Sequence, residues 1–92
     1  MPPDKPSDQD QIQTRRRRRA EFIRALYLRV NADVNEFIDG LELGAAVGLD
    51  ADETRRIIAY FEEKGAVRVD DHKSALIRLT AAGVDLVEAE IP

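Results

Sequence analysis

The segment DGLELGAAVGLDADETRRIIAYFEEKGAV, residues 39–67, contains two helix starts and two helix ends in close succession. Each start is an Asp followed three residues later by a Glu, the spacing of a capping box, in which side chains bind free backbone N–H groups. Each end is a glycine, the residue that most easily adopts the left-handed conformation that closes a helix. The positions are Asp39 and Glu42, Asp50 and Glu53, and Gly48 and Gly65. The segment therefore predicts one helix that ends at Gly48 and a second over 51–64, joined by a turn of about three residues.

A longer helix is predicted before this segment, because apolar residues recur there at steps of three and four. These residues are Phe22, Ile23, Leu26, Tyr27 and Val30. Ser7 and Asp10 have capping-box spacing, so this helix can begin near Asp8. Residues 1–12 hold three prolines and few apolar side chains, which indicates a flexible tail ahead of a single domain over 13–92.

After the second glycine terminator the pattern changes from helical spacing to alternation, which is typical of strands. Val67 and Val69 flank a polar residue, and residues 70–74 are polar and turn-like. A returning strand then alternates through Ala75, Ile77 and Leu79. This pattern predicts a two-stranded hairpin at about residues 66–80, followed by a short C-terminal helix capped by Thr80. The apolar residues predicted to be mostly buried are Phe22, Leu26, Leu43, Leu49, Ile58, Phe61, Val67 and Leu79.

The composition excludes several classes of protein. The chain has 92 residues, a formal net charge of −4, no cysteine and one histidine, so thiolate metal sites, disulfide scaffolds and histidine clusters are absent from the sequence. No apolar run approaches the ~20 residues of a membrane helix, and the N-terminus lacks the apolar stretch of a signal peptide. We therefore expect a cytoplasmic protein that does not enter a membrane and holds no metal or cofactor.

The charge is unevenly distributed along the chain. Residues 1–32 hold eight basic and four acidic side chains, a net of +4, whereas residues 33–92 hold six basic and fourteen acidic side chains, a net of −8. Five consecutive arginines, Arg15 to Arg19, carry most of the positive charge. They stand near the start of a helix, where the dipole disfavours cations, so such a run needs either a partner or acidic neighbours.

The predicted order of helix, short extended pair, helix, tight turn, helix, hairpin and helix resembles the winged helix-turn-helix domains of bacterial and archaeal transcriptional regulators. The likeness lies in residues 39–50, 54–67 and 77–83, which are similar to the helix-two and turn segment, the recognition helix and the exit from the wing. The resemblance implies an α+β, mainly α fold with a three-helix core, a two-stranded β wing and a C-terminal helix.

The same resemblance implies a small regulator that binds duplex DNA. Its DNA-reading residues fall on the exposed face of the third helix and on the wing, and the arginine run would add contacts to phosphates. The residues expected at DNA are Arg55, Arg56 and Tyr60 of the helix, Arg68 and Lys73 of the hairpin, and Arg15, Arg16, Arg17, Arg18 and Arg19 of the run. A homodimer through the first and last helices is also expected, because Val84, Leu86 and Val87 leave apolar surface at the chain end.

A second interpretation stays open beside the first. Asp50, Asp52 and Glu53 crowd the start of the third helix and repel phosphate, and the hairpin tip at 70–73 is not basic overall. The domain would then be a protein–protein interaction module without DNA binding. Its arginine run would pair either with acids of the body or with an acidic protein partner.

Other chemical motifs are weak. The glycines at 40, 44 and 48 lack the Gly-Lys-Ser/Thr of a phosphate-binding loop, and we expect Gly44 to allow close helix packing instead. Asp70, His72 and Ser74 have the residue types of a catalytic triad, but they fall on an exposed turn with no oxyanion donors implied. The sequence therefore predicts no catalytic residues and no enzyme.

Overall fold

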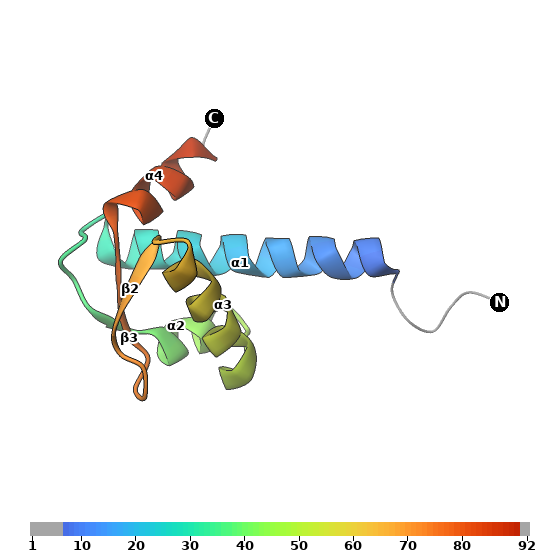
Figure 1. The fold of residues 1–92 in the computed structure, drawn as a ribbon, viewed down its shortest axis with the longest axis horizontal. Coiled ribbons are helices and arrows are strands. Elements are labelled where there is room, and N and C mark those ends of the chain that lie inside the picture. The colour runs from blue at the N-terminus through green and yellow to red at the C-terminus, as the bar shows by residue number, and fades with distance from the viewer. Residues whose placement is uncertain (1–6, 91–92) are drawn as a thin grey trace.

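The computed structural model describes residues 7–90 and shows an α+β, mainly helical protein with four helices and a three-stranded antiparallel sheet in that range. Figure 1 shows the arrangement of these elements. Their bounds are α1 Asp8–Val30, β1 Ile38–Asp39, α2 Gly40–Ala46, α3 Ala51–Glu63, β2 Val67–Asp71, β3 Leu76–Leu79 and α4 Ala81–Ala89.

The predicted caps form at the helix starts. The Asp39 carboxylate accepts hydrogen bonds from the backbone N–H groups of Leu41 and Glu42, at 2.9 and 3.1 Å, and Asp50 accepts one from Glu53 at 2.8 Å. Both glycine terminators have left-handed backbone, with φ of 85° at position 48 and 77° at position 65. The two central helices therefore begin and end for the local reasons that the sequence indicates.

The first helix begins inside the segment whose composition predicts a tail. Ser7 accepts a hydrogen bond from the Asp10 backbone N–H at 3.2 Å, and α1 starts at Asp8. Residues 8–12 of the expected tail over 1–12 are therefore helical, because this cap operates ahead of the apolar stripe. Residues 1–6 of that tail lie outside the described residues.

The sheet contains one strand more than the predicted two-stranded wing. The expected hairpin forms from β2 and β3, with Val67 opposite Leu79, but β1 pairs with the other edge of β3 to give the order β1-β3-β2. The Gly40 backbone N–H also donates to the Ala75 carbonyl at 2.8 Å, which extends this contact past the strand. A two-residue strand has no periodicity of its own, so only pairing with β3 defines it.

All eight residues predicted for the core are buried, each with 7% or less of its surface exposed. Phe61 is 3% exposed, which confirms the orientation of α3. The predicted close packing at Gly44 is also present, because a Cβ added there would collide with the Thr54 side chain of α3. On α4, Val87 is buried and Val84 half-buried, so Leu86 is the apolar residue of the expected dimer surface that stays exposed.

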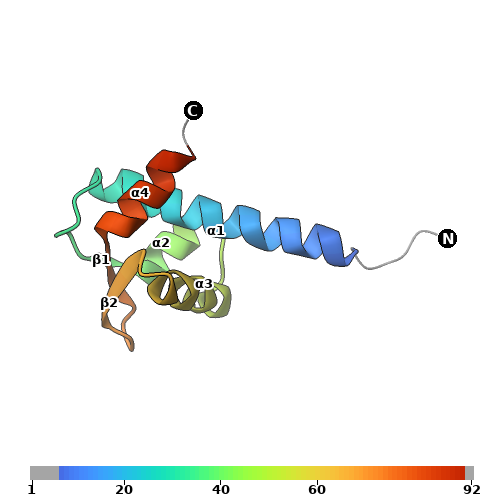
Figure 2. The same cartoon turned by 45° about the horizontal axis from the view of Figure 1, so that its top comes forward.

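Helix α1 is the longest helix and lies between the other helices. In Figures 1 and 2 it runs across the fold with α4 on one side and α2 and α3 on the other. Its C-terminal half supplies the buried residues of the core, whereas its N-terminal half extends past the other elements (Figure 1). The arginine run lies at the junction between these halves, where it meets α3 and the groove beside α4.

Candidate nucleic-acid interface

The outer face of α3 carries the residues that the sequence analysis predicts there. Arg55, Arg56, Ala59 and Tyr60 are all exposed, with Asp52 one turn earlier. Because Arg55 and Arg56 are consecutive, they are about 100° apart around the helix and point to its two flanks. One flank meets the hairpin and the other meets α1.

On the hairpin flank, Arg55 holds the turn between β2 and β3. Its Nη1 and Nη2 donate to the backbone carbonyl oxygens of His72 and Lys73, at 2.9 and 3.0 Å. The His72 Nε2 also lies 3.0 Å from a carboxylate oxygen of Glu62. The guanidinium of Arg55 is therefore engaged in positioning the β2–β3 turn next to α3.

The turn itself is held by one carboxylate. Asp71 accepts hydrogen bonds from the Ser74 hydroxyl at 2.9 Å and from the Lys73 backbone N–H at 3.0 Å. The Ser74 hydroxyl, and then the Lys73 N–H, lower the pKa of Asp71 below its ordinary value, because both bonds favour the charged form. Two of the three residues that suggest a catalytic triad are thus engaged elsewhere, with Ser74 bonded to Asp71 and His72 facing Glu62.

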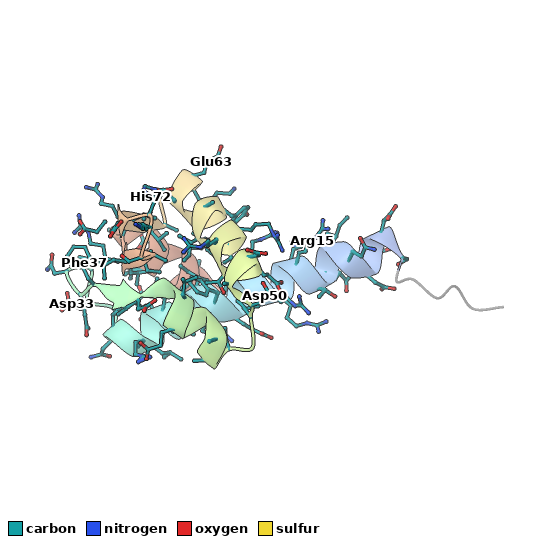
Figure 3. All side chains as sticks on the ribbon, turned by 90° about the horizontal axis from the view of Figure 1, so that it is seen from below. Arg15, Asp33, Phe37, Asp50, Glu63 and His72 are labelled. Atoms are coloured by element: carbon teal, nitrogen blue, oxygen red, sulfur yellow. The ribbon has the colours of Figure 1, made fainter. Side chains whose placement is uncertain are left out.

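On the other flank, Arg56 shares a cleft with the arginine run. We call this the α1–α3 cleft; its volume is about 400 Å³, and its lining residues are Arg15, Arg19, Glu53, Arg56, Ile57 and Tyr60. A neighbouring hollow continues it along α1 and adds Gln11, Thr14 and Arg18. Figure 3 shows Arg15 on the part of α1 that extends from the body, and Asp50 at the nearby start of α3. Residues about 40 positions apart in sequence thus form one basic surface.

Two interactions hold the run against α3. The Arg19 guanidinium lies 4.4 Å from the centroid of the Tyr60 ring, a cation–π distance. Nη1 of Arg18 donates to both carboxylate oxygens of Glu53, at 2.7 and 2.9 Å. The Glu53 carboxylate raises the pKa of Arg18 above its ordinary value, through the hydrogen bond first and its charge second. These interactions align α1 with α3, and the sequence carried no signal for their pairing.

Helical geometry divides the arginine run into different faces. Arg15 and Arg19, one turn apart, lie on the same face and both line the cleft. Arg17 lies about 200° from each of them around the axis, on the outer face of α1. Only part of the run therefore belongs to the surface next to α3.

The two cations of the hairpin that were expected at DNA, Lys73 and Arg68, also lie on different faces. Lys73 is exposed in the turn that Arg55 holds, so it lies beside α3 as predicted. Arg68 is exposed on β2 opposite Arg78 of β3. Because strand side chains alternate and Val69 lines a hollow with Arg55, Arg68 points to the other face of the sheet. The structure does not bring Arg68 to the surface formed by α3 and the run.

Acidic side chains reduce the charge of this surface. Asp50 and Asp52 are exposed at the start of α3, and Asp50 also caps that helix. Glu53 is more enclosed, with 19% of its side chain exposed, and Arg18 neutralises it. The net positive charge of the cleft therefore comes from Arg15, Arg19 and Arg56.

Metal and membrane features are absent from the described residues. Between residues 7 and 90 there is no group of three or more His, Cys, Asp or Glu side chains placed to hold a metal ion. Within the same range no helix has the length and apolar character needed to cross a membrane. The arrangement on α1 and α3 is suited to binding anions, because arginines donate paired hydrogen bonds to phosphate and carboxylate groups.

No family model, curated protein or solved structure matches this chain.

Proposed function

We propose that this chain is a winged helix-turn-helix domain that binds duplex DNA and acts as a small transcriptional regulator. In this proposal α2, the turn and α3 form the helix-turn-helix, α3 enters the major groove, and the β2–β3 hairpin is the wing. The observation that carries it is the α1–α3 cleft, in which Arg15 and Arg19 of the run converge with Arg56 and Tyr60 of the reading helix.

The arginines have different roles in this proposal. Arg56 is exposed and forms no hydrogen bond or ion pair within the described residues, so it is available to a guanine edge or a phosphate. Arg15 and Arg19 contact the backbone beside the groove, where they add affinity without sequence information. Arg55 sets the position of the wing through its two hydrogen bonds to carbonyl oxygens instead of reading a base.

The second candidate is a protein-interaction module, and one observation favours it. Glu53 neutralises Arg18, while Asp50 and Asp52 stay exposed at the end of α3 that enters the groove in DNA-bound helices. An acidic helix start lowers affinity for phosphate and leaves the arginines to an acidic protein partner.

Binding to labelled duplexes of random sequence over a salt series separates the two candidates. A DNA-binding domain gives a saturable anisotropy change whose log affinity falls linearly with log salt concentration. The double variant Arg15→Ala/Arg19→Ala should reduce the salt slope by about two, because each of the two arginines neutralises one phosphate. Arg17→Ala/Arg24→Ala removes the same charge from exposed positions that do not line the cleft, so it should change the slope less.

Base reading is tested on a sequence selected from a random library. Arg56→Ala should weaken the selected site more than random duplex, by about 1–3 kcal/mol. The absence of binding to any duplex at low salt would exclude the regulator and leave the interaction module.

A further inference from the structure

A second hollow opens where α1, α3 and α4 meet, on the other side of Arg19 from the α1–α3 cleft. We call it the three-helix groove; its volume is about 290 Å³ and it is open to solvent. Leu86 contributes exposed apolar surface to it, and Ile23 and Phe61 also line it, although each is only 3% exposed. Arg16, Arg19 and Lys64 contribute cations. It is therefore a depression of mixed apolar and polar lining in which cations outnumber acids.

Two large exposed side chains lie together at this groove. Residues 7–90 contain five large apolar or aromatic side chains that are exposed, which are Ile12, Leu28, Phe37, Tyr60 and Leu86. Two of the five line the three-helix groove, Leu86 with 40% and Tyr60 with 39% of its surface exposed. Clustered apolar exposure of this kind marks an interaction surface more than a single exposed leucine does.

The cations that line the three-helix groove favour a negatively charged occupant. Arg19 and Lys64 both lie over the Tyr60 ring, at 4.4 and 5.7 Å from its centroid, so the ring holds two cations at the mouth of the groove. Arg16 adds a third, and Glu90 is the one acidic side chain among the lining residues. Three cations against one carboxylate favour an acidic occupant.

We propose that the three-helix groove binds an acidic amphipathic segment of a partner protein. A bulky apolar side chain of that segment covers Leu86 and Tyr60, while flanking carboxylates pair with Arg16 and Lys64. The groove lies at the small end of the range for small-molecule pockets and is open to solvent, which suits anchoring side chains of a chain better than an enclosed ligand. The proposal does not depend on DNA binding, because Arg16, Lys64 and Leu86 line this groove and not the α1–α3 cleft.

The test uses a synthetic helical peptide that carries leucines at steps of three and four and glutamates at the remaining positions. Fluorescence anisotropy measures its affinity for the full chain, and amide chemical shifts locate the binding surface. We expect saturable binding, with the largest shifts at Ala20, Ala66 and Ala82, which also line the groove. Leu86→Ala and Arg16→Glu should each weaken binding about tenfold.

Matched controls separate the groove from general charge and apolar effects. Leu28→Ala removes an exposed leucine, 69% exposed, from outside the groove, and Arg17→Glu reverses a charge on the outer face of α1. Both should leave the affinity within about twofold of the parent chain. All four positions are exposed, so circular dichroism should show each variant folded.

Four outcomes would overturn the proposal. The first is equal binding of a peptide in which lysine replaces glutamate, and the second is an unchanged affinity in Leu86→Ala. The third is a set of shifts that appears in the groove when the chain is concentrated without peptide, which identifies a second copy as the occupant. The fourth is a set of groove shifts produced by duplex DNA and not by the acidic peptide, which assigns the groove to the DNA surface.

Discussion

Nη1 of Arg18 lies 2.7 and 2.9 Å from the two carboxylate oxygens of Glu53, so the arginine run is tied to the first turn of α3. Glu53 also donates its backbone N–H to the Asp50 cap of the same helix. One residue thus takes part in starting α3 and in aligning it with α1. In this ion pair, the charge of one of the five arginines is neutralised by the most enclosed of the three acidic side chains at the start of α3.

Under the proposed function, replacing Glu53 by Gln should strengthen binding to duplex DNA. The amide keeps the backbone cap, removes one negative charge from the cleft and frees Arg18, so the affinity for random duplex should rise at low salt. The cost in stability should be small, since Arg18 is half exposed and solvent screens its ion pair. Glu63→Gln, an exposed change at the other end of α3, is the control. Equal gains in the two variants would show that net charge alone is responsible.

Replacing Arg55 by Ala should loosen the β2–β3 turn without unfolding the core. The variant cannot form the two hydrogen bonds to the carbonyl oxygens of His72 and Lys73, so amide hydrogen exchange across residues 71–75 should become faster. Arg56→Ala should leave that exchange unchanged, because Arg56 lies on the opposite flank of α3. Unchanged exchange in the Arg55 variant would mean that the sheet alone holds the turn.

Replacing Phe61 by Ala should destabilise the whole domain. The ring is 3% exposed and packs edge-to-face with Tyr60, with centroids 5.2 Å apart, so its removal should cost about 3–5 kcal/mol in urea unfolding. Tyr60→Ala, at the exposed side of the same pair, should cost much less. Similar costs for the two variants would contradict the placement of α3.

Replacing Gly44 by Ala should separate α2 from α3. The added methyl group meets the Thr54 side chain, which is fully buried, and overpacking of this kind costs about 1–3 kcal/mol. The double variant Gly44→Ala/Thr54→Ala should be destabilised by less than the sum of the two single variants, because the shorter side chain leaves room. Additive effects in a denaturation cycle would show that the two positions do not interact.

The pH dependence of the β2–β3 turn follows from Asp71. Hydrogen bonds from Ser74 and Lys73 lower its pKa, so it stabilises the turn above the ordinary Asp pKa of about 3.9. That contribution disappears as the pH falls through the lowered value, because the protonated carboxyl no longer accepts both bonds. A pH titration of the Asp71 carboxyl by NMR should show this lowered midpoint. Ser74→Ala should move the midpoint back toward the ordinary value, whereas an unshifted midpoint in both proteins would remove the basis for this prediction.

Much of the fold was predictable because its causes are local. Helix starts at Asp39 and Asp50 and helix ends at Gly48 and Gly65 depend on hydrogen bonds and backbone angles within a few residues. The core followed from apolar spacing, since periods of 3.6 and 2 place side chains on one face of a helix or strand. For the α1–α3 cleft, the sequence predicted only that the arginine run would lie near the third helix. It did not predict which arginines line the cleft.

The amino-acid sequence by itself therefore determined where the helices and the hairpin form and which faces they bury, because these depend on neighbours along the chain. Tertiary structure decided the rest. Strand β1 exists because β3 lies beside it, and Arg18 meets Glu53 because α1 crosses α3. Such pairings join positions 35 or more residues apart, and they depend on how whole elements cross. No local pattern specified that Arg19 stacks on Tyr60 while Arg17 points away from α3, because that division follows from the rotation of α1 in the packed fold.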